Sequence, residues 1–208
     1  MKIFLISIFL LISIQKAIIP SKMLVIYYSR TGNTEKFAKY ITDATNITSY
    51  RIIPANAYPE DYDEMLKIAE NEIDNNARPE IKSPLTDVSN YDIILLGYPL
   101  WYGHIPNILI TQLEKLNLNG KVIYPFNTHG SSGVKYSVDD IKSHASGATV
   151  KDGYAIAASK IQNKEDEVID WLDDNFDLNS DVKFNSAQYY YNKIKYKLFL
   201  FICLYIII

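Results

Sequence analysis

The sequence predicts an α/β protein in which a doubly wound, five-stranded parallel sheet lies between two layers of helices. Two observations lead to this prediction. Short runs of β-branched and aromatic residues alternate with segments whose apolar residues recur at helical spacing. Polar, glycine-containing segments follow the first, third and fourth of these runs, where a parallel sheet places its ligand site. The 208 residues, 48% of them apolar, are enough to bury one core.

Each predicted strand is a short run rich in Val, Ile, Leu, Tyr or Phe that ends near a turn-forming residue. The first ends at the polar turn that contains Gly32, and the second ends at Pro54. The third is apolar throughout, as expected of a strand covered on both faces. In chain order, the predicted strands are 24–28, 49–53, 93–97, 121–126 and 153–157.

Five helices are predicted because apolar residues recur three or four positions apart. In the first, Phe37, Ala38 and Ile41 share one face, and the third opens at Pro106, a residue well suited to a first turn. In chain order, the predicted helices are 34–44, 61–76, 106–116, 139–145 and 165–176.

The two ends of the chain differ from this pattern, so we divide the chain into residues 1–22, a domain over 23–178 and a tail over 179–208. The apolar block Ile3–Ile14 has the size of the apolar region of a signal peptide and is too short to span a bilayer. The alternative is that translation starts at Met23. The tail is rich in Lys, Tyr and Ile and ends in an apolar block, which is either non-functional or loosely membrane-seeking.

Localisation follows from the same alternatives. The protein is cytoplasmic if translation starts at Met23, and secreted or membrane-associated if residues 1–22 are a true targeting segment. Membrane contact is expected only through the terminal segments. The net charge of −3 hides a contrast, because residues 23–178 hold 14 basic and 23 acidic residues, a net −9. An acidic domain argues against nucleic-acid binding and favours basic partners.

The segment after the first predicted strand has the composition of an anion-binding loop. Residues 29–34, Ser-Arg-Thr-Gly-Asn-Thr, place three hydroxyls, an amide and a glycine at a helix N-terminus, where free N–H groups favour an anion. This predicts a phosphate cradle. The segment is neither a Walker loop nor the three-glycine dinucleotide fingerprint. The alternative is an ordinary helix N-cap formed by Ser or Thr.

Three segments together resemble the flavodoxin family, in the order and spacing of one flavodoxin-like subgroup. They are Ser29-x-Thr31-Gly32-Asn33-Thr34, then Gly97-Tyr98-Pro99-Leu100-Trp101-Tyr102-Gly103, then Thr128-His129-Gly130-Ser131-Ser132-Gly133. The segment Tyr58-Pro59-Glu60-Asp61-Tyr62 also fits, and the resemblance covers about residues 23–177. It implies a flavodoxin-like sandwich with strand order 2-1-3-4-5 and FMN as a non-covalent cofactor.

The resemblance also implies which residues bind the cofactor. The phosphate-binding positions are Ser29, Thr31, Gly32, Asn33 and Thr34, while Arg30 occupies a variable position that is expected to face solvent. The loop beside the isoalloxazine ring is Pro99, Leu100, Trp101, Tyr102 and Gly103, and the second ring-side loop is Thr128, His129, Gly130, Ser131, Ser132 and Gly133. Trp101 or Tyr102 can stack on the ring. The alternative for both is aromatic core packing.

The three histidines leave alternatives open. His129 either donates to the flavin or a substrate, or has a structural role, and His104 either lines the mouth of the site or does not. His144 is expected at the surface of a helix. No residue is predicted to be catalytic, and no His, Asp or Glu cluster suggests a metal. The single cysteine, Cys203, excludes an internal disulfide and a cysteine-based zinc site.

Three functions remain open at this stage. The first is an FMN protein that carries electrons between redox partners, and the second is an FMN-dependent oxidoreductase that passes electrons from NAD(P)H to a quinone-type acceptor. The partner is accordingly a redox protein or a small-molecule electron acceptor. The third is a flavin-free binding module of the same fold. A receiver domain is disfavoured, because Tyr27-Tyr28-Ser29 and Gly97-Tyr98 replace the acidic residues that it needs.

Overall fold

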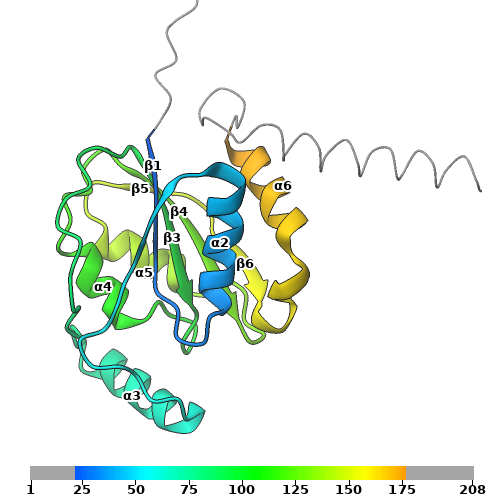
Figure 1. Cartoon of the computed structure of the whole chain (residues 1–208). Coiled ribbons are helices and arrows are strands. Elements are labelled where there is room, and N and C mark those ends of the chain that lie inside the picture. The colour runs from blue at the N-terminus through cyan, green and yellow to red at the C-terminus, as the bar shows by residue number, and fades with distance from the viewer. Residues whose placement is uncertain (1–21, 177–208) are drawn as a thin grey trace, which may run out of the picture.

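The central sheet of the computed structural model, which describes residues 22–176, is parallel throughout (Figure 1). The strand order is β2-β1-β3-β4-β5, with β6 also paired to β4, so the predicted order 2-1-3-4-5 is confirmed. The strands are β1 (Met23–Tyr27), β2 (Thr48–Arg51), β3 (Ile93–Pro99), β4 (Val122–His129), β5 (Thr149–Val150) and β6 (Tyr154–Ala157). The predictions for residues 1–21 and for the tail from 177 onward lie outside the described residues.

Two strands differ from the prediction. The predicted fifth strand is β6, and the two-residue β5, too short for a periodic pattern, precedes it along the same edge of β4. Residues 127–129 were expected in a loop but belong to β4. They are strand residues because each has a neighbour in β6, and Asn127 and Thr128 also pair with Tyr98 and Pro99 of β3.

The five predicted helices are present, with ends shifted by a few residues, and a short 3-10 helix, η1, was not predicted. Helices α2 and α6 cover one face of the sheet, and α4 and α5 cover the other (Figure 1). The helices are α2 (Asn33–Thr45), α3 (Tyr62–Asp74), α4 (Asn107–Leu113), α5 (Ser137–His144), η1 (Ala158–Asn163) and α6 (Glu165–Asn175).

Aromatic packing under α2 explains a glycine in β3. The rings of Phe37 and Phe126 lie 4.6 Å apart, and both side chains are fully buried. A Cβ atom at Gly97 would come within 2.2 Å of the Phe126 ring. Only glycine therefore lets Phe126 lie over β3, and the fully buried aromatic rings supply much of the apolar burial on this face.

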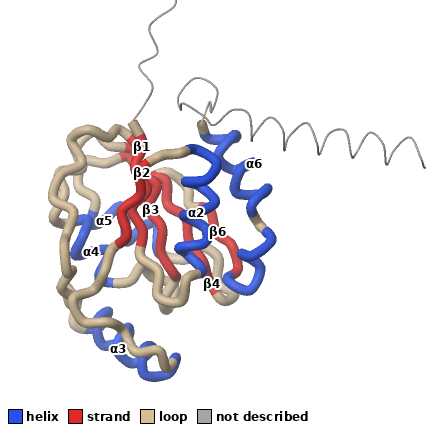
Figure 2. Tube along the Cα trace, viewed as in Figure 1, coloured by secondary structure: helices blue, strands red, loops and turns tan. Residues whose placement is uncertain are grey.

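Helix α3 does not lie flat on the sheet but extends beyond the carboxyl ends of the strands (Figure 2). The chain leaves β2 and returns alongside itself, with the N–H of Ala55 donating to Glu80 O at 2.8 Å and that of Lys82 to Ile53 O at 2.9 Å. We call residues 53–82 the α3 arm. Within residues 22–176, no helix is both long and apolar enough to cross a membrane.

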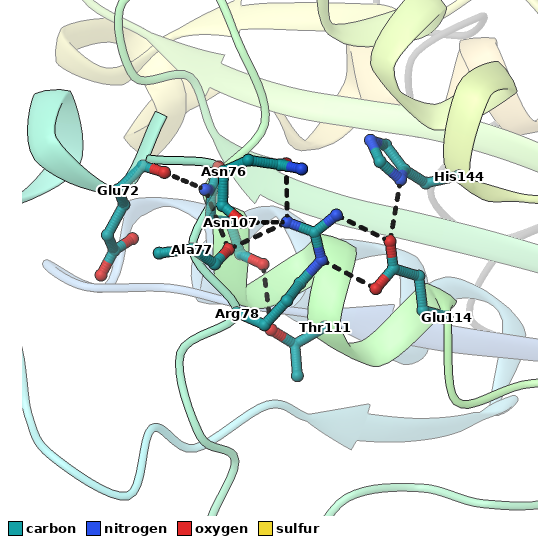
Figure 3. Close-up of polar contacts among 8 residues, drawn as sticks. All are labelled: Glu72, Asn76, Ala77, Arg78, Asn107, Thr111, Glu114 and His144. Carbon is teal, nitrogen blue, oxygen red and sulfur yellow. Dashed lines mark hydrogen bonds and ion pairs between the residues drawn. The ribbon is translucent and has the colours of Figure 1, made fainter. Parts of the chain in front are cut away.

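A polar network holds the returning end of the α3 arm against α4 and α5 (Figure 3). The guanidinium of Arg78 donates to both carboxylate oxygens of Glu114, at 2.7 and 2.8 Å. His144 Nδ1 lies 3.0 Å from the same carboxylate. Asn107 Nδ2 donates to the carbonyl of Glu72 at 2.6 Å. Since Arg78 holds the pKa of Glu114 below its usual value, this carboxylate stays charged to acidic pH.

Candidate functional site

The three polar loops meet at one edge of the sheet. They follow β1, β3 and β4, which are neighbours in the strand order, so their carboxyl ends lie side by side. The loops comprise residues 28–32, 100–106 and 130–136. The α3 arm extends from the same edge (Figure 1).

The first loop leaves the start of α2 without a side-chain cap. Gly32 occupies the N-cap position, and no side chain caps the helix there, so the N-cap alternative is wrong. The hydroxyl of Ser29 instead accepts the N–H of Gly32 at 3.1 Å. Gly32 has a φ of 87°, with nothing within 4 Å of where a Cβ would lie. The first-turn N–H groups therefore remain open to a negatively charged ligand.

A buried hydroxyl pair ties the first loop to β4. Thr34 Oγ1 and Thr128 Oγ1 lie 2.8 Å apart, and both residues are at most 4% exposed. Thr31, by contrast, is exposed, and its hydroxyl accepts the Nδ2 donor of Asn33 at 3.2 Å. Two predicted site residues, 94 positions apart in the chain, are thus in direct contact.

Two arginines flank the first loop. Arg30 was expected to face solvent, but it is half-buried and donates to the carbonyls of Pro59 and Glu60 at 2.9 and 3.0 Å. Arg51 bonds Glu35 at 2.8 Å and the carbonyl of Ser29 at 3.3 Å. Sequence reasoning missed Arg51, although its position at the end of the strand beside β1 could have identified it.

The second loop separates its two aromatic residues. Trp101 and His104 exchange backbone hydrogen bonds of 3.0 and 2.8 Å across a tight turn, in which Tyr102 and Gly103 have φ values of 50° and 89°. Trp101 is 5% exposed, whereas Tyr102 is 50% exposed. The adjacent aromatic residues therefore have different environments, and only Tyr102 presents its ring to solvent.

Trp101 belongs to a buried aromatic cluster with Tyr28 and Tyr58. Its ring meets theirs edge-on, at centroid distances of 5.8 and 4.9 Å. The phenol of Tyr58 also donates to the buried carboxylate of Glu72 at 3.0 Å. Burial raises the pKa of both phenols well above the ordinary range, and it also raises the pKa of Glu72. The core-packing alternative thus describes Trp101.

The second and third loops are joined to each other. The N–H of Tyr136 donates to the carbonyl of Gly103 at 3.0 Å, and the ring of Tyr136 stacks on that of His104 at 5.2 Å. A Cβ on Gly103 would lie 3.3 Å from atoms of Lys135 and Tyr136. The two loops therefore form one connected rim, and His104 is part of it.

The end of β4 contributes buried polar atoms to the site. Both amide atoms of Asn127 and the Nδ1 atom of His129 are buried and form no well-aligned hydrogen bond within the described residues, although the Asn127 amide lies near the hydroxyl of Tyr98. Burial lowers the pKa of His129, which favours the neutral imidazole. It raises that of Tyr98 to about 12. Beyond the strand, Gly130, Ser131 and Ser132 are exposed and Gly133 is half-buried.

The side chains at this edge of the sheet are suited to ligand binding rather than to acid–base chemistry. The buried phenols at this edge stay neutral, and within residues 22–176 no His, Cys, Asp or Glu cluster is arranged to hold a metal ion. What the edge offers is an uncapped helix start, hydroxyls, aromatic surface and unpartnered polar atoms. Such a set suits a ligand with an anionic end and a flat end that carries polar atoms.

Residues 22–175 match the sequence profile of the family described as Flavodoxin. The chain is similar to a candidate flavoprotein from Bacteroides eggerthii, with 31% identity and a TM-score of 0.65, over 74% of this chain and 96% of that one. It is also similar to a flavoprotein in complex with FMN from Lactobacillus acidophilus, with 27% identity and a TM-score of 0.57, over 68% of this chain and 97% of that one.

A curated relative is an NAD(P)H dehydrogenase (quinone) from Acidovorax ebreus. The two are 28% identical over 110 residues, which amount to 49% of this chain and 53% of the relative. The chain thus spans about half the length of that protein.

Proposed function

Because this chain belongs to the flavodoxin family, we propose that it binds FMN at the carboxyl edge of the sheet and carries electrons between redox partners. When bound, FMN supplies one- and two-electron redox chemistry, and the protein binds and orients it. We assign the residues that would hold the cofactor from the geometry of this chain.

The observation that carries the proposal is the uncapped start of α2 behind a loop of hydroxyls. The phosphate group fits here because the first-turn N–H groups are available and the helix dipole favours a negative charge. Ser29, Thr31 and Thr34 add hydroxyl donors, and Gly32 keeps its surroundings free of side-chain bulk. Arg51 adds a positive charge within reach of the loop.

The ring fits the rim formed by the second and third loops. Tyr102 presents an exposed aromatic ring, whereas Trp101 is buried and packs against Tyr28. The unpartnered polar atoms of Asn127 and His129 suit the polar edge of a flavin. We therefore assign stacking to Tyr102 and a packing role to Trp101.

The α3 arm gives the rim an acidic border that suits a basic redox partner. Burial raises the pKa of the Tyr102 phenol, and Glu70 and Tyr62 of α3 are close enough to add to the rise. Helix α3 also carries Asp63, Glu64 and Asp74. Like-charged groups on one side of a site steer oppositely charged partners toward it.

The second candidate function is an FMN-dependent oxidoreductase that passes electrons from NAD(P)H to a quinone-type acceptor. The similarity to the Acidovorax dehydrogenase favours it, although that similarity spans about half of each chain. Donor and acceptor can use the same flavin face in turn, so a separate nicotinamide site is not required.

The proposal is tested by purifying the full chain and identifying the released cofactor by chromatography. The protein is expected to be yellow and to release FMN. A colourless protein that takes up no added FMN would contradict both redox functions and favour the flavin-free binding module.

Mixing the FMN-loaded protein with NADPH or NADH separates the two redox functions. Rapid bleaching of the flavin, with turnover when a quinone is added, would identify an oxidoreductase. A carrier is reduced only when a separate reductase is present.

A further inference from the structure

His104 and Asp140 form an imidazole–carboxylate pair beside the rim of the site. His104 Nδ1 lies 3.0 Å from Oδ2 and 3.1 Å from Oδ1 of Asp140. Oδ2 also accepts the backbone N–H of Ile105 at 3.1 Å, which fixes the carboxylate. Tyr136 stacks on the imidazole with an interplanar angle of 26°. The ring is therefore held at one nitrogen and on one face.

The opposite nitrogen is the one available for chemistry. Within residues 22–176, Nε2 of His104 forms no hydrogen bond, while Nδ1 is occupied by Asp140. The side chain is 36% exposed, so protons can be exchanged with water. His104 directly follows Gly103, whose carbonyl binds the third loop, and it therefore lies where the two ring-side loops join.

We propose that His104 is the proton donor to a two-electron acceptor that is reduced at this site, and that Asp140 is its positioning residue. This inference rests on the proposed FMN site and gives it an acceptor class, a quinone-type carbonyl compound. FMN, when bound and reduced, would supply a hydride to one carbonyl oxygen of the quinone, and the opposite carbonyl oxygen would become an oxyanion. The Nε2–H bond of the His104 imidazolium then breaks as the O–H bond forms, and water restores the proton.

Asp140 acts through the imidazole. Its carboxylate balances the positive charge of the imidazolium, and in the neutral ring it holds the remaining proton on Nδ1. An amide at this position can still accept the N–H of Ile105, but it can donate to Nδ1 and so move the proton of the neutral ring to Nε2. Asp140→Asn therefore keeps the fold and reverses the tautomer.

The test uses the full-length, FMN-loaded protein, reduced with dithionite and mixed with either a quinone or ferricyanide. Ferricyanide accepts one electron and no proton. In His104→Gln, oxidation by the quinone is expected to slow by about 100-fold, the scale of a lost general acid, while oxidation by ferricyanide stays within about twofold. His144→Gln is the matched control, because His144 has a carboxylate partner but lies outside the site, and both of its rates should match the wild type.

A second readout does not involve turnover. In the FMN-free protein, ¹⁵N NMR of neutral His104 should show the proton on Nδ1, and Asp140→Asn should shift it toward Nε2. A wild-type proton on Nε2 would overturn the role of Asp140. Equal effects of His104→Gln on quinone and ferricyanide, or no effect on either, would overturn the proton-donor role.

The outcomes separate this inference from the proposed function. A wild-type protein that binds FMN and is oxidised by ferricyanide but not by quinones contradicts the inference and leaves the carrier function intact. A protein that binds no FMN contradicts both.

Discussion

The two ends of the proposed FMN site are built in different ways. The phosphate end, residues 28–34, is one continuous segment whose working groups are backbone N–H groups and short hydroxyls. The ring end combines loops about 30 residues apart in the chain, joined by the Tyr136–Gly103 hydrogen bond, and the His104–Asp140 pair ties the second loop to α5. The first end is set by local backbone geometry and the second by tertiary contacts, so substitutions at the two ends should have different consequences.

The largest expected effect comes from Trp101→Ala at the ring end. Removing a ring that is 5% exposed and packed between Tyr28 and Tyr58 should lower the free energy of unfolding by about 3–5 kcal/mol. Denaturant unfolding measures this. A loss below about 1 kcal/mol would place Trp101 outside the core and return it to the role of a stacking residue.

Thr34→Val tests the phosphate end. The substitution preserves shape but removes a buried hydroxyl that bonds Thr128 and that we propose also donates to the phosphate, so FMN affinity should fall by about 2 kcal/mol. Riboflavin, which has no phosphate, should lose much less. The matched control is Thr42→Val in the same helix, because the hydroxyl of Thr42 donates only to Lys39 O. If Thr34→Val weakens both ligands equally, Thr34 acts through packing.

Tyr102→Ala sharpens the contrast with its neighbour Trp101. The side chain is half exposed, so its loss should leave the free energy of unfolding almost unchanged. Loss of aromatic stacking should weaken both FMN and riboflavin by about 1 kcal/mol. Unaltered flavin affinity, measured by fluorescence titration, would contradict a stacking role for Tyr102.

Glu114→Gln tests the ion pair between Arg78 of the α3 arm and Glu114, which lies outside the proposed FMN site. Arg78 lowers the pKa of Glu114 in the folded state, so its stabilisation is complete above the unfolded pKa near 4.5 and is lost as pH falls through the folded value. The side chain is 40% exposed, so the loss at neutral pH should be only about 0.5 kcal/mol.

Urea unfolding at pH 7 and pH 3 measures the difference in the free energy of unfolding between the wild type and Glu114→Gln. This difference should be smaller at pH 3. Asp152→Asn, at an exposed position between β5 and β6, is the control. FMN affinity should be unchanged in both variants, and a loss confined to Glu114→Gln would mean that the α3 arm positions the site.

The sequence predicted features that depend on local patterns better than features that depend on tertiary contacts. The family, the strand order and FMN as the cofactor of a flavodoxin-like redox protein are confirmed, because strand runs and the first loop are local patterns. The assignment of each cofactor-binding residue stays a prediction. The alternation of apolar residues could not show that α3 extends beyond the sheet, because its buried residues Met65 and Ala69 still belong to the core cluster on the α4 and α5 face.

The sequence predictions at the site missed the tertiary contacts. Arg30 was expected in solvent, because nothing in residues 29–34 indicates carbonyl acceptors 29 and 30 positions away. The adjacent Trp101 and Tyr102 were treated as a pair, since a turn with two positive φ values cannot be inferred from an aromatic–aromatic–glycine pattern. The contact between His104 and Asp140 joins residues 36 positions apart, and no local sequence pattern indicates it.

The most direct test of the account is a paired titration of the FMN-free, full-length protein with FMN and with riboflavin. If the uncapped start of α2 binds the phosphate, FMN should bind at least about 100-fold more tightly than riboflavin, as charge-assisted hydrogen bonds would produce. Equal affinities for the two flavins would contradict the assignment of residues 29–34 as the phosphate site.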